Sequence, residues 1–283
     1  MKKRSLRNRH IKIRRLGVEE TIWTDLYHRT LRLSWPRFFG IVFFCFVTIN
    51  LVFGSLFAMA PQSLSDGGKL DYWTNFAFSV QTFSTIGYGN IYPITAYGNF
   101  LVTIEAAVSL ISTALLTGLI FSKFSLPSAR IVFSSNMLWT TQNGEPVLSV
   151  RLGNVRANQV FDGRAKMTLL RDETSAEGER LRRLVDMKLT RNQTPLFALS
   201  WTLFHPIDST SPIYGVTPED IQKSGWEVIV TFVGLDQDMG QTIAAHSTYR
   251  GEHIIRARKF ADMIDFVDNT RVIDFSKLHQ IED

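Results

Sequence analysis

This chain of 283 residues has little cysteine, and two long stretches of it have almost no charge. Cys45 is its one cysteine, which excludes an intrachain disulfide. Residues 38–60 contain no charged side chain, and residues 96–122 contain only Glu105. At about 1.5 Å per residue, a helix over the first stretch reaches ~34 Å and crosses a hydrocarbon core of about 30 Å. The sequence therefore predicts membrane spans over about 38–60 and 97–122, which argues against a purely soluble enzyme.

Enzyme motifs are missing as well. We find no nucleophile–base set, no phosphate-binding loop and no glycine-rich nucleotide fingerprint after a strand. The six histidines show no metal-ligand spacing, so His205 is interpreted as a residue that supports the fold. These absences predict a protein that is not an enzyme and has no cofactor.

The net charge of +5 is distributed unevenly. Residues 1–37 carry 11 basic and three acidic side chains, whereas Lys69 is the only basic residue between the two apolar stretches. Nucleic acid could attract a basic tail, but an excess of Lys and Arg beside a first span follows the positive-inside rule. We therefore expect no nucleic acid partner. Both termini should lie in the cytoplasm, with residues 61–95 outside or dipping back into the membrane.

The segment before the first span has two parts. Residues 1–20 form a basic tail, and residues 21–34 have a helical period with Ile22, Leu26 and Leu31 on one side. A helix lying in the membrane interface fits this amphipathic pattern, and an ordinary connector helix is the alternative. Trp35-Pro36 predicts a break before the span, because proline restricts the residue that precedes it.

Beyond Pro127, which is expected to end the second span, the pattern changes to a period of two. Residues 147–152, 164–171 and 227–233 alternate in polarity or form short β-rich runs between turn residues. No long run there has a clean helical stripe. Residues 127–283 are therefore expected to form an all-β sandwich or barrel, and residues 21–126 a membrane domain.

A short apolar segment, residues 72–84, leads directly into Thr85-Ile86-Gly87-Tyr88-Gly89. As a helix it would cross only about half of the bilayer. Non-helical backbone at membrane depth is tolerated only where it is buried in protein or lines a water-filled path. In such a path the carbonyls of residues 85–88 and the Thr85 hydroxyl would replace an ion's hydration shell, and the two glycines would let the backbone aim them at one axis. Two spans cannot enclose a pore, so several copies must assemble.

The string at residues 85–89 resembles the potassium channel filter, Thr-Val/Ile-Gly-Tyr-Gly. Together with Ser34-Trp35-Pro36, the two spans and the β-rich second half, it resembles the inwardly rectifying potassium channels, especially their prokaryotic branch. The motifs of the second half that carry this resemblance are Val132-Phe133-Ser134, Arg151-Leu-Gly-Asn-Val-Arg156, His205-Pro-Ile-Asp208 and Ser211-Pro-Ile-Tyr214.

The resemblance implies an α+β membrane protein with an interfacial slide helix, a re-entrant pore helix and a cytoplasmic immunoglobulin-like sandwich that extends the pore. It implies a homotetramer in a cell membrane, the bacterial inner membrane, with K⁺ bound only at the filter by Thr85, Ile86, Gly87, Tyr88 and Gly89. The competing interpretation, a non-conducting membrane-tethered sensor or adaptor, leaves the filter string unexplained.

Four residues recur every four positions along the second span: Ser109, Thr113, Thr117 and Phe121. They fall near one helix face and either pack against another helix or line a wet cavity. The resemblance implies the cavity. It places Thr113 at the position that governs block by Mg²⁺ and polyamines, where strong rectifiers carry Asp, and Phe121 at the gate that narrows the inner mouth.

Glu105 is the one ionisable residue deep in a span and is a functional candidate on that ground. Eukaryotic relatives brace the filter with a Glu–Arg pair, but Gln81 and Ile91 stand at those positions here. Glu105 bonded to Gln81 or to backbone amides is a candidate replacement. A carboxyl simply buried in the bundle is the alternative.

Two further sets complete the prediction. The basic residues near the cytoplasmic membrane surface either form a solvated collar or bind anionic lipid, as the resemblance implies; they are Arg29, Arg32, Arg37, Lys123 and Arg130. The resemblance also implies a cytoplasmic constriction at Met239, Gly240, Gln241 and Ala245. Asp236 and Asp238 beside it either attract cations or solvate a turn.

Overall fold

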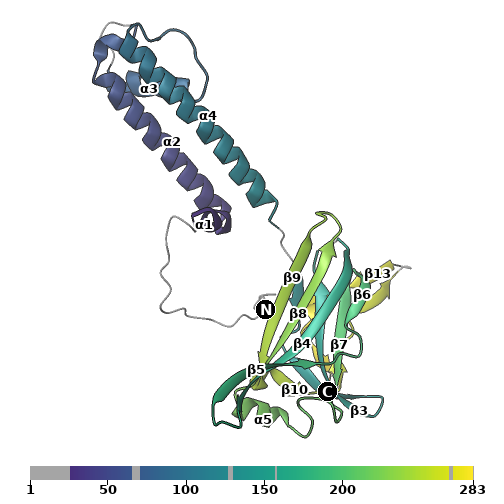
Figure 1. Cartoon of the computed structure of the whole chain (residues 1–283). Coiled ribbons are helices and arrows are strands. Elements are labelled where there is room, and N and C mark those ends of the chain that lie inside the picture. Colours follow the sequence, from purple (N-terminus) through teal and green to yellow (C-terminus); the bar gives the residue numbers. More distant parts are fainter. Residues whose placement is uncertain (1–25, 66–70, 127–129, 157, 268–269, 283) are drawn as a thin grey trace. The chain divides into compact units, whose positions relative to one another are not determined.

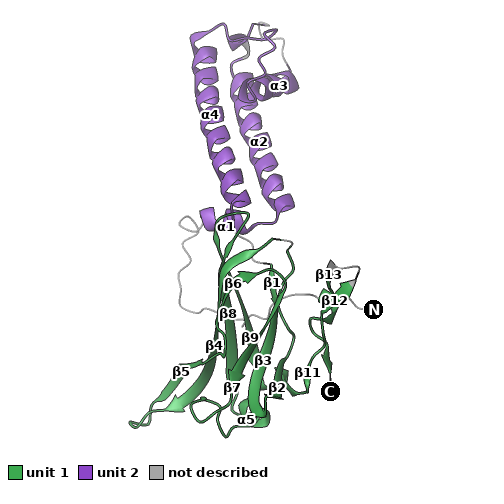
Figure 2. Cartoon of the chain, turned by 90° about the vertical axis from the view of Figure 1, so that its right-hand side faces the viewer, with its two compact units in different colours: residues 1–14, 127–283 green, residues 15–126 purple. Residues whose placement is uncertain are grey.

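The computed structural model of the protein describes residues 26–282 apart from 66–70, 127–129, 157 and 268–269 (Figure 1). The chain divides after residue 126 into two compact units (Figure 2). We call the first the helical unit and the second the β unit.

The helical unit contains two long helices with a short helix between them in sequence (Figure 1). Pro36 lies in the first turn of the first long helix, where its missing N–H is not needed. Asp71 accepts a hydrogen bond from Thr74 N (2.9 Å) at the start of the short helix, and Thr95 accepts one from Gly98 N (3.1 Å) at the start of the second long helix. The helices are α1 (Leu26–Arg32), α2 (Trp35–Ala58), α3 (Tyr72–Phe83) and α4 (Ala96–Phe124), with a 3₁₀ turn at Pro61–Ser63.

These helices correspond to the segments predicted from the sequence. Both α2 and α4 are long and apolar enough to cross a membrane. The interfacial segment is helical from Leu26, and the predicted start at residues 21–25 lies outside the described residues. Helix α2 already begins at Trp35, so the break before the first span falls at Leu33 and Ser34.

Aromatic packing joins the helices of this unit. Phe57 of α2 and Phe78 of α3 are buried and meet edge to face, with ring centroids 5.1 Å apart. A Cβ on Gly54 would lie 2.9 Å from Phe76 Cα, so this glycine lets α2 and α3 approach closely. By contrast, Phe43 and Phe44 of α2 and Leu110 of α4 are at least 68% exposed. Such large apolar faces need lipid or further protein against them.

The β unit contains two five-stranded sheets. In the first, β3 pairs antiparallel with β1, β2 and β7, and β10 adds in parallel to β2. In the second, β4 pairs antiparallel with β5, β6 and β8, and β8 with β9. The first sheet consists of β1 (Ile131–Phe133), β2 (Met137–Gln142), β3 (Glu145–Asn154), β7 (Ser200–Pro206) and β10 (Ile254–Arg256). The second consists of β4 (Val160–Thr174), β5 (Arg180–Met187), β6 (Gln193–Phe197), β8 (Glu227–Asp236) and β9 (Thr242–Arg250).

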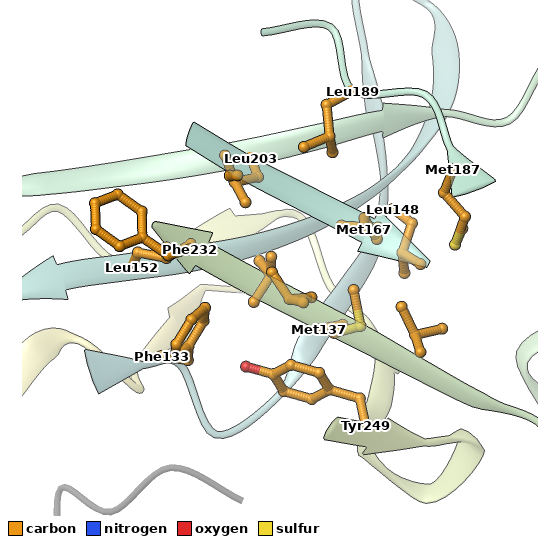
Figure 3. Packing of buried hydrophobic residues seen from close by; sticks show 14 of the residues in the cluster. Phe133, Met137, Leu148, Leu152, Met167, Met187, Leu189, Leu203, Phe232 and Tyr249 are labelled. Carbon is orange, nitrogen blue, oxygen red and sulfur yellow. The ribbon is translucent and has the colours of Figure 1, made fainter. Parts of the chain in front are cut away.

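The core lies between these two sheets (Figure 3). Leu148 and Leu152 of β3 and Leu203 of β7 face Met167 of β4 and Phe232 of β8. Leu148, Val150 and Leu152 of β3 are fully buried in this core, whereas Ser149 and Arg151 between them lie outside it, which is the expected period of two. The predicted sandwich is thus confirmed, and the predicted strand runs lie within β3, β4 and β8.

Short elements complete the β unit. Helix α5 (Pro218–Lys223) was not predicted, although Thr217 and Asp220 form the capping box that starts it. The remaining elements are β11 (Lys259–Phe260), β12 (Ile264–Val267), β13 (Thr270–Ile273) and β14 (Ile281–Glu282), with 3₁₀ turns at Gly251–His253 and Phe275–Lys277.

Candidate functional site

Helix α3 leads directly into the filter string. It ends at Phe83, and Thr85 and Ile86 are tied back to it through Thr85 N to Thr82 O (3.0 Å) and Ile86 N to Gln81 O (2.8 Å). The C-terminal end of a helix carries partial negative charge and favours a cation nearby. The segment therefore begins where the partial negative charge of the helix end favours a cation.

The φ angle alternates in sign along residues 85–89. The φ angle is +57° at Thr85, +56° at Gly87 and +82° at Gly89, whereas Ile86 and Tyr88 keep negative φ. Alternation of this kind turns successive carbonyls toward one side of the chain. The glycines were expected to permit it, but the left-handed Thr85 was not foreseen. A β-branched residue at positive φ is strained, and such strain concentrates at functional sites.

The segment is exposed in a single chain. Ile86 is 50% and Tyr88 72% exposed, and no atom lies within 4 Å of a Cβ built on Gly87 or Gly89. Rings of backbone carbonyls can replace the hydration shell of K⁺. A ring needs carbonyls from further copies of the chain.

Behind this segment, three helices meet in a buried polar cluster. Ser79 Oγ of α3 lies 2.5 Å from Glu105 Oε1 of α4 and 3.0 Å from Asn50 Oδ1 of α2. All three side chains are buried, and Glu105 Oε2 has no hydrogen-bond partner among the described residues. Ser79 thus links Glu105 of α4 and Asn50 of α2 to α3. The expected partner Gln81 is wrong, because Gln81 is two residues from Ser79 and points to another face of α3.

Ser79 is the residue of this cluster whose loss should cost most. The Ser79 hydroxyl has one proton, which faces the oxygens of Asn50 and Glu105. Ser79→Ala removes it, and a buried acceptor left without a donor costs about 1–3 kcal/mol. We expect the detergent-purified variant to unfold at a lower midpoint temperature. Glu105→Gln, a neutral side chain of the same shape, should be tolerated.

Thr103→Val is the matched control, because the Thr103 hydroxyl returns to Asn99 O of its own helix (2.8 Å). The double variant Ser79→Ala/Glu105→Leu should recover part of the lost stability by removing one orphaned acceptor. Equal midpoint temperatures for Ser79→Ala and Thr103→Val would contradict the prediction that the cluster of Ser79, Glu105 and Asn50 stabilises the packing of the three helices.

The stripe along α4 divides into two parts. Ser109 is buried and donates to Phe83 O at the end of α3, so its expected place in the cavity is wrong. It ties α4 to the end of α3 instead, two residues before Thr85. Thr113, Thr117 and Phe121 are exposed, Phe121 by 72%. The drift of about 40° per four residues separates them from the face of Ser109.

The basic set also divides. Arg29, Arg32 and Arg37 of the helical unit are exposed, as is Arg130 of the β unit. Lys123 is 8% exposed and donates to Leu31 O (2.8 Å) and Leu33 O (2.5 Å). Its ammonium therefore does not share the exposed surface that the sequence suggested for it.

The loop after β8 is built around Asp236. Its carboxylate accepts from Asp238 N (3.0 Å), Met239 N (3.2 Å) and Asn158 Nδ2 (2.7 Å), and the residue is buried. Asp236 thus shapes the turn that carries the predicted constriction residues. Met239 is 45% exposed at the tip, Gly240 has φ +60°, and Gln241 and Ala245 are half-buried.

His205 supports the fold, as predicted. Its Nδ1 donates to Lys188 O (2.7 Å) and its Nε2 accepts from Ser211 Oγ (2.7 Å). Among the described residues, no group of three His, Cys, Asp or Glu side chains could hold a metal. Burial lowers the pKa of His205 below its ordinary value of 6.5. The lowered pKa favours the neutral imidazole, in which Nδ1 carries the proton that faces Lys188 O.

We expect acid to destabilise the β unit through this residue. Below pH 6.5 the unfolded chain binds a proton that the folded His205 resists, so the free energy of unfolding falls as the pH falls. Urea midpoints of the full chain in detergent at about pH 7.5 and 5.5 would measure this. His205→Gln should flatten the dependence, whereas His246→Gln, at an exposed position, should keep it. An unchanged dependence in His205→Gln would contradict the assignment.

Comparison with known proteins complements this geometry. A family model described as "Inward rectifier potassium channel C-terminal domain" matches residues 131–283, and one described as "Ion channel" matches residues 41–125. The chain is 37% identical to the inward rectifier potassium channel Kirbac3.1 of Paramagnetospirillum magnetotacticum, over 95% of this chain and 92% of that protein.

Mammalian relatives are more distant. The chain is 25% identical to the ATP-sensitive inward rectifier potassium channel 12 of Mus musculus and 24% identical to the inward rectifier potassium channel 18 of Homo sapiens, in each case over 90% of this chain. It spans 65% and 64% of the length of these two proteins.

Proposed function

This chain belongs to the inward rectifier potassium channel family, a family of ion channels and not of enzymes, and from this premise we propose that it forms a homotetrameric K⁺-selective pore. The observation that carries the proposal is the alternating backbone of Thr85, Gly87 and Gly89 at the end of α3. Four such segments around one axis would place carbonyls of Thr85, Ile86, Gly87 and Tyr88 in successive rings. K⁺ would be the only ion that the protein binds there.

The exposed surfaces of the helical unit support the proposed assembly. The open side of residues 85–89 and the exposed face of α4 at Thr113, Thr117 and Phe121 would line the pore. Mg²⁺ or polyamines entering the cavity would meet neutral threonines at Thr113, so we propose weak block. The four Phe121 rings would close the inner mouth by excluding water.

Ser79, Glu105 and Ser109 would stabilise the filter from behind, with Gln81 supporting it through its backbone carbonyl. In the β unit, the turn at Met239–Gln241 and Ala245 would form a second constriction, held in shape by Asp236.

We place the protein in a cell membrane, with both termini and the β unit in the cytoplasm. The charge excess before α2 supports this orientation. Arg29, Arg32, Arg37 and Arg130 are exposed and would interact with anionic lipid, each with about 1 kcal/mol near the surface.

Flux through liposomes tests the function. The purified protein should pass K⁺ and Rb⁺, exclude Na⁺ and be blocked by Ba²⁺, because a rigid carbonyl filter selects by ion size and field strength. Empty liposomes are the control. Equal Na⁺ and K⁺ fluxes from well-folded protein would reject the proposal.

A further inference from the structure

We propose that residues 63–65 form a strap that holds the end of the filter at Gly89 in its conducting conformation, with Ser65 as the positioning residue. The inference rests on the proposed K⁺-selective pore. It assigns a role in selectivity to the connection between α2 and α3, which lies outside the filter and its pore helix.

The filter segment is tied to α3 at its start only. Thr85 N and Ile86 N are bonded to carbonyls of α3, whereas no backbone hydrogen bond among the described residues holds residues 87–91. Gly87 and Gly89 both have positive φ, and glycine permits many other backbone conformations. A segment that must keep one conformation therefore needs a second tie beyond Gly89.

Tyr92 provides this second tie, and its partner is Ser65. Ser65 N donates to Tyr92 O (2.8 Å), and Tyr92 N donates to Ser65 Oγ (3.2 Å). Two residues further along the chain, Ile94 N donates to Ser63 O (2.9 Å). Three hydrogen bonds thus join the strap to the chain that follows the filter, and one of them depends on the Ser65 side chain.

The strap itself is anchored in the core of the helical unit. Leu64 is 1% exposed and belongs to a buried cluster with Phe57 of α2 and Phe78 of α3. Its backbone pairs with Pro93 as an antiparallel β-bridge. Because a buried side chain fixes the position of the strap, the strap can in turn fix the position of Tyr92.

Gly98 lies where the strap meets the first turns of α4. A Cβ built on Gly98 would lie 2.6 Å from Ser63 O and 3.2 Å from Pro93 Cβ, so a larger residue would clash with the backbone of the strap. Ser63 O is also the atom that accepts from Ile94 N. A side chain at position 98 would therefore push the strap away from the chain that follows the filter.

The strap should matter most when the filter holds little K⁺. A bound ion stabilises the conformation that binds it, and it does so more strongly as the ion concentration rises. High K⁺ would therefore compensate for a weakened tie. At low K⁺ the filter would depend on its ties to the rest of the chain, so the end at Gly89 would relax first when the strap is impaired.

Ser65→Ala tests the strap because it removes the acceptor of Tyr92 N and keeps the backbone. After incubation of proteoliposomes in Na⁺ solution with little K⁺, the ratio of K⁺ to Na⁺ flux should fall about tenfold below that of the wild type, and high K⁺ should restore it. Gly98→Ala should act in the same direction. Thr103→Val, which removes a hydroxyl bonded within its own helix, is the matched control and should keep the ratio. An unchanged ratio in Ser65→Ala, or an equal fall in Thr103→Val, would overturn the proposal.

Hydrogen exchange gives a readout that does not depend on conduction. In the full protein in lipid nanodiscs, the amide of Tyr92 should exchange about tenfold faster in Ser65→Ala, and those of Tyr92 and Ile94 in Gly98→Ala. Thr103→Val should leave both amides unchanged. If Gly98→Ala does not fold, Ser65→Ala decides, and unchanged exchange of Tyr92 in that variant would refute the tie. A wild type without K⁺ flux would reject the channel and the role in selectivity, whereas exchange would still decide whether the strap holds Tyr92.

Discussion

Gly87→Ala should abolish selective K⁺ flux. Gly87 has φ +56°, where a residue with a Cβ is disfavoured by about 1–2 kcal/mol. Four copies of the substitution around one pore would cost ~4–8 kcal/mol, enough to displace the filter from its conducting conformation. Apart from Gly87 and its two chain neighbours, no residue of the same chain has an atom within 4 Å of the added Cβ, so the cost arises from the backbone conformation and not from a clash with packed side chains. The ratio of K⁺ to Na⁺ flux in liposomes measures the effect.

Gly118→Ala is the matched control. Gly118 lies within α4, has no positive φ, and a Cβ there meets nothing within 4 Å. It should keep selectivity, since alanine is favoured over glycine in a helix. If Gly87→Ala kept the K⁺ to Na⁺ ratio of the wild type, the left-handed conformation would not be needed for selection.

The parts that the sequence predicted well are those set by neighbours along the chain. The two long apolar helices follow from runs without charge, and the short helix α3 follows from the apolar segment between them. Local chemistry also explains where α3 and α4 begin, since Asp71 and Thr95 cap the residues just after them. Helix α5 was missed although its signal, Thr217 and Asp220, is equally local.

The contacts between helices could not be predicted from the spacing of residues along the sequence. The four-residue period groups Ser109 with Phe121, but Ser109 bonds to Phe83 O while Phe121 stays exposed. Which face meets α3 depends on how the helices cross, and the sequence does not contain that angle. Ser79 and Asn50 were overlooked for the same reason. A polar residue at position 50 in an otherwise apolar span was the available signal.

Charge alone did not predict the contacts of Lys123. A basic residue at the end of a span is usually solvated or bound to lipid headgroups, and the sequence offers no sign of the carbonyls of Leu31 and Leu33. Those acceptors lie some 90 residues earlier in the chain. Only the packing of α1 against α4 brings them to the ammonium.

Phe121→Ala should raise basal K⁺ flux. Phe121 is 72% exposed in one chain, on the part of α4 that would meet its copies at the inner mouth. Four phenyl rings there would keep the closed constriction dry, and four methyl groups would leave it wide enough to stay wet. A shift of ~1.4 kcal/mol in the balance between closed and open states already gives about tenfold more flux. Flux from liposomes without anionic lipid isolates this basal component.

Phe100→Ala separates a gate from a general loosening of α4. Phe100 lies near the other end of the same helix and is 62% exposed, so the two substitutions remove equal volumes from similar surroundings. Only the ring at the inner mouth should control flux, because a constriction acts where the pore is narrowest. If both variants raised flux alike, α4 packing would set the basal rate. If neither did, the constriction would lie elsewhere, and the turn at Met239–Gln241 of the β unit would be the next barrier to remove.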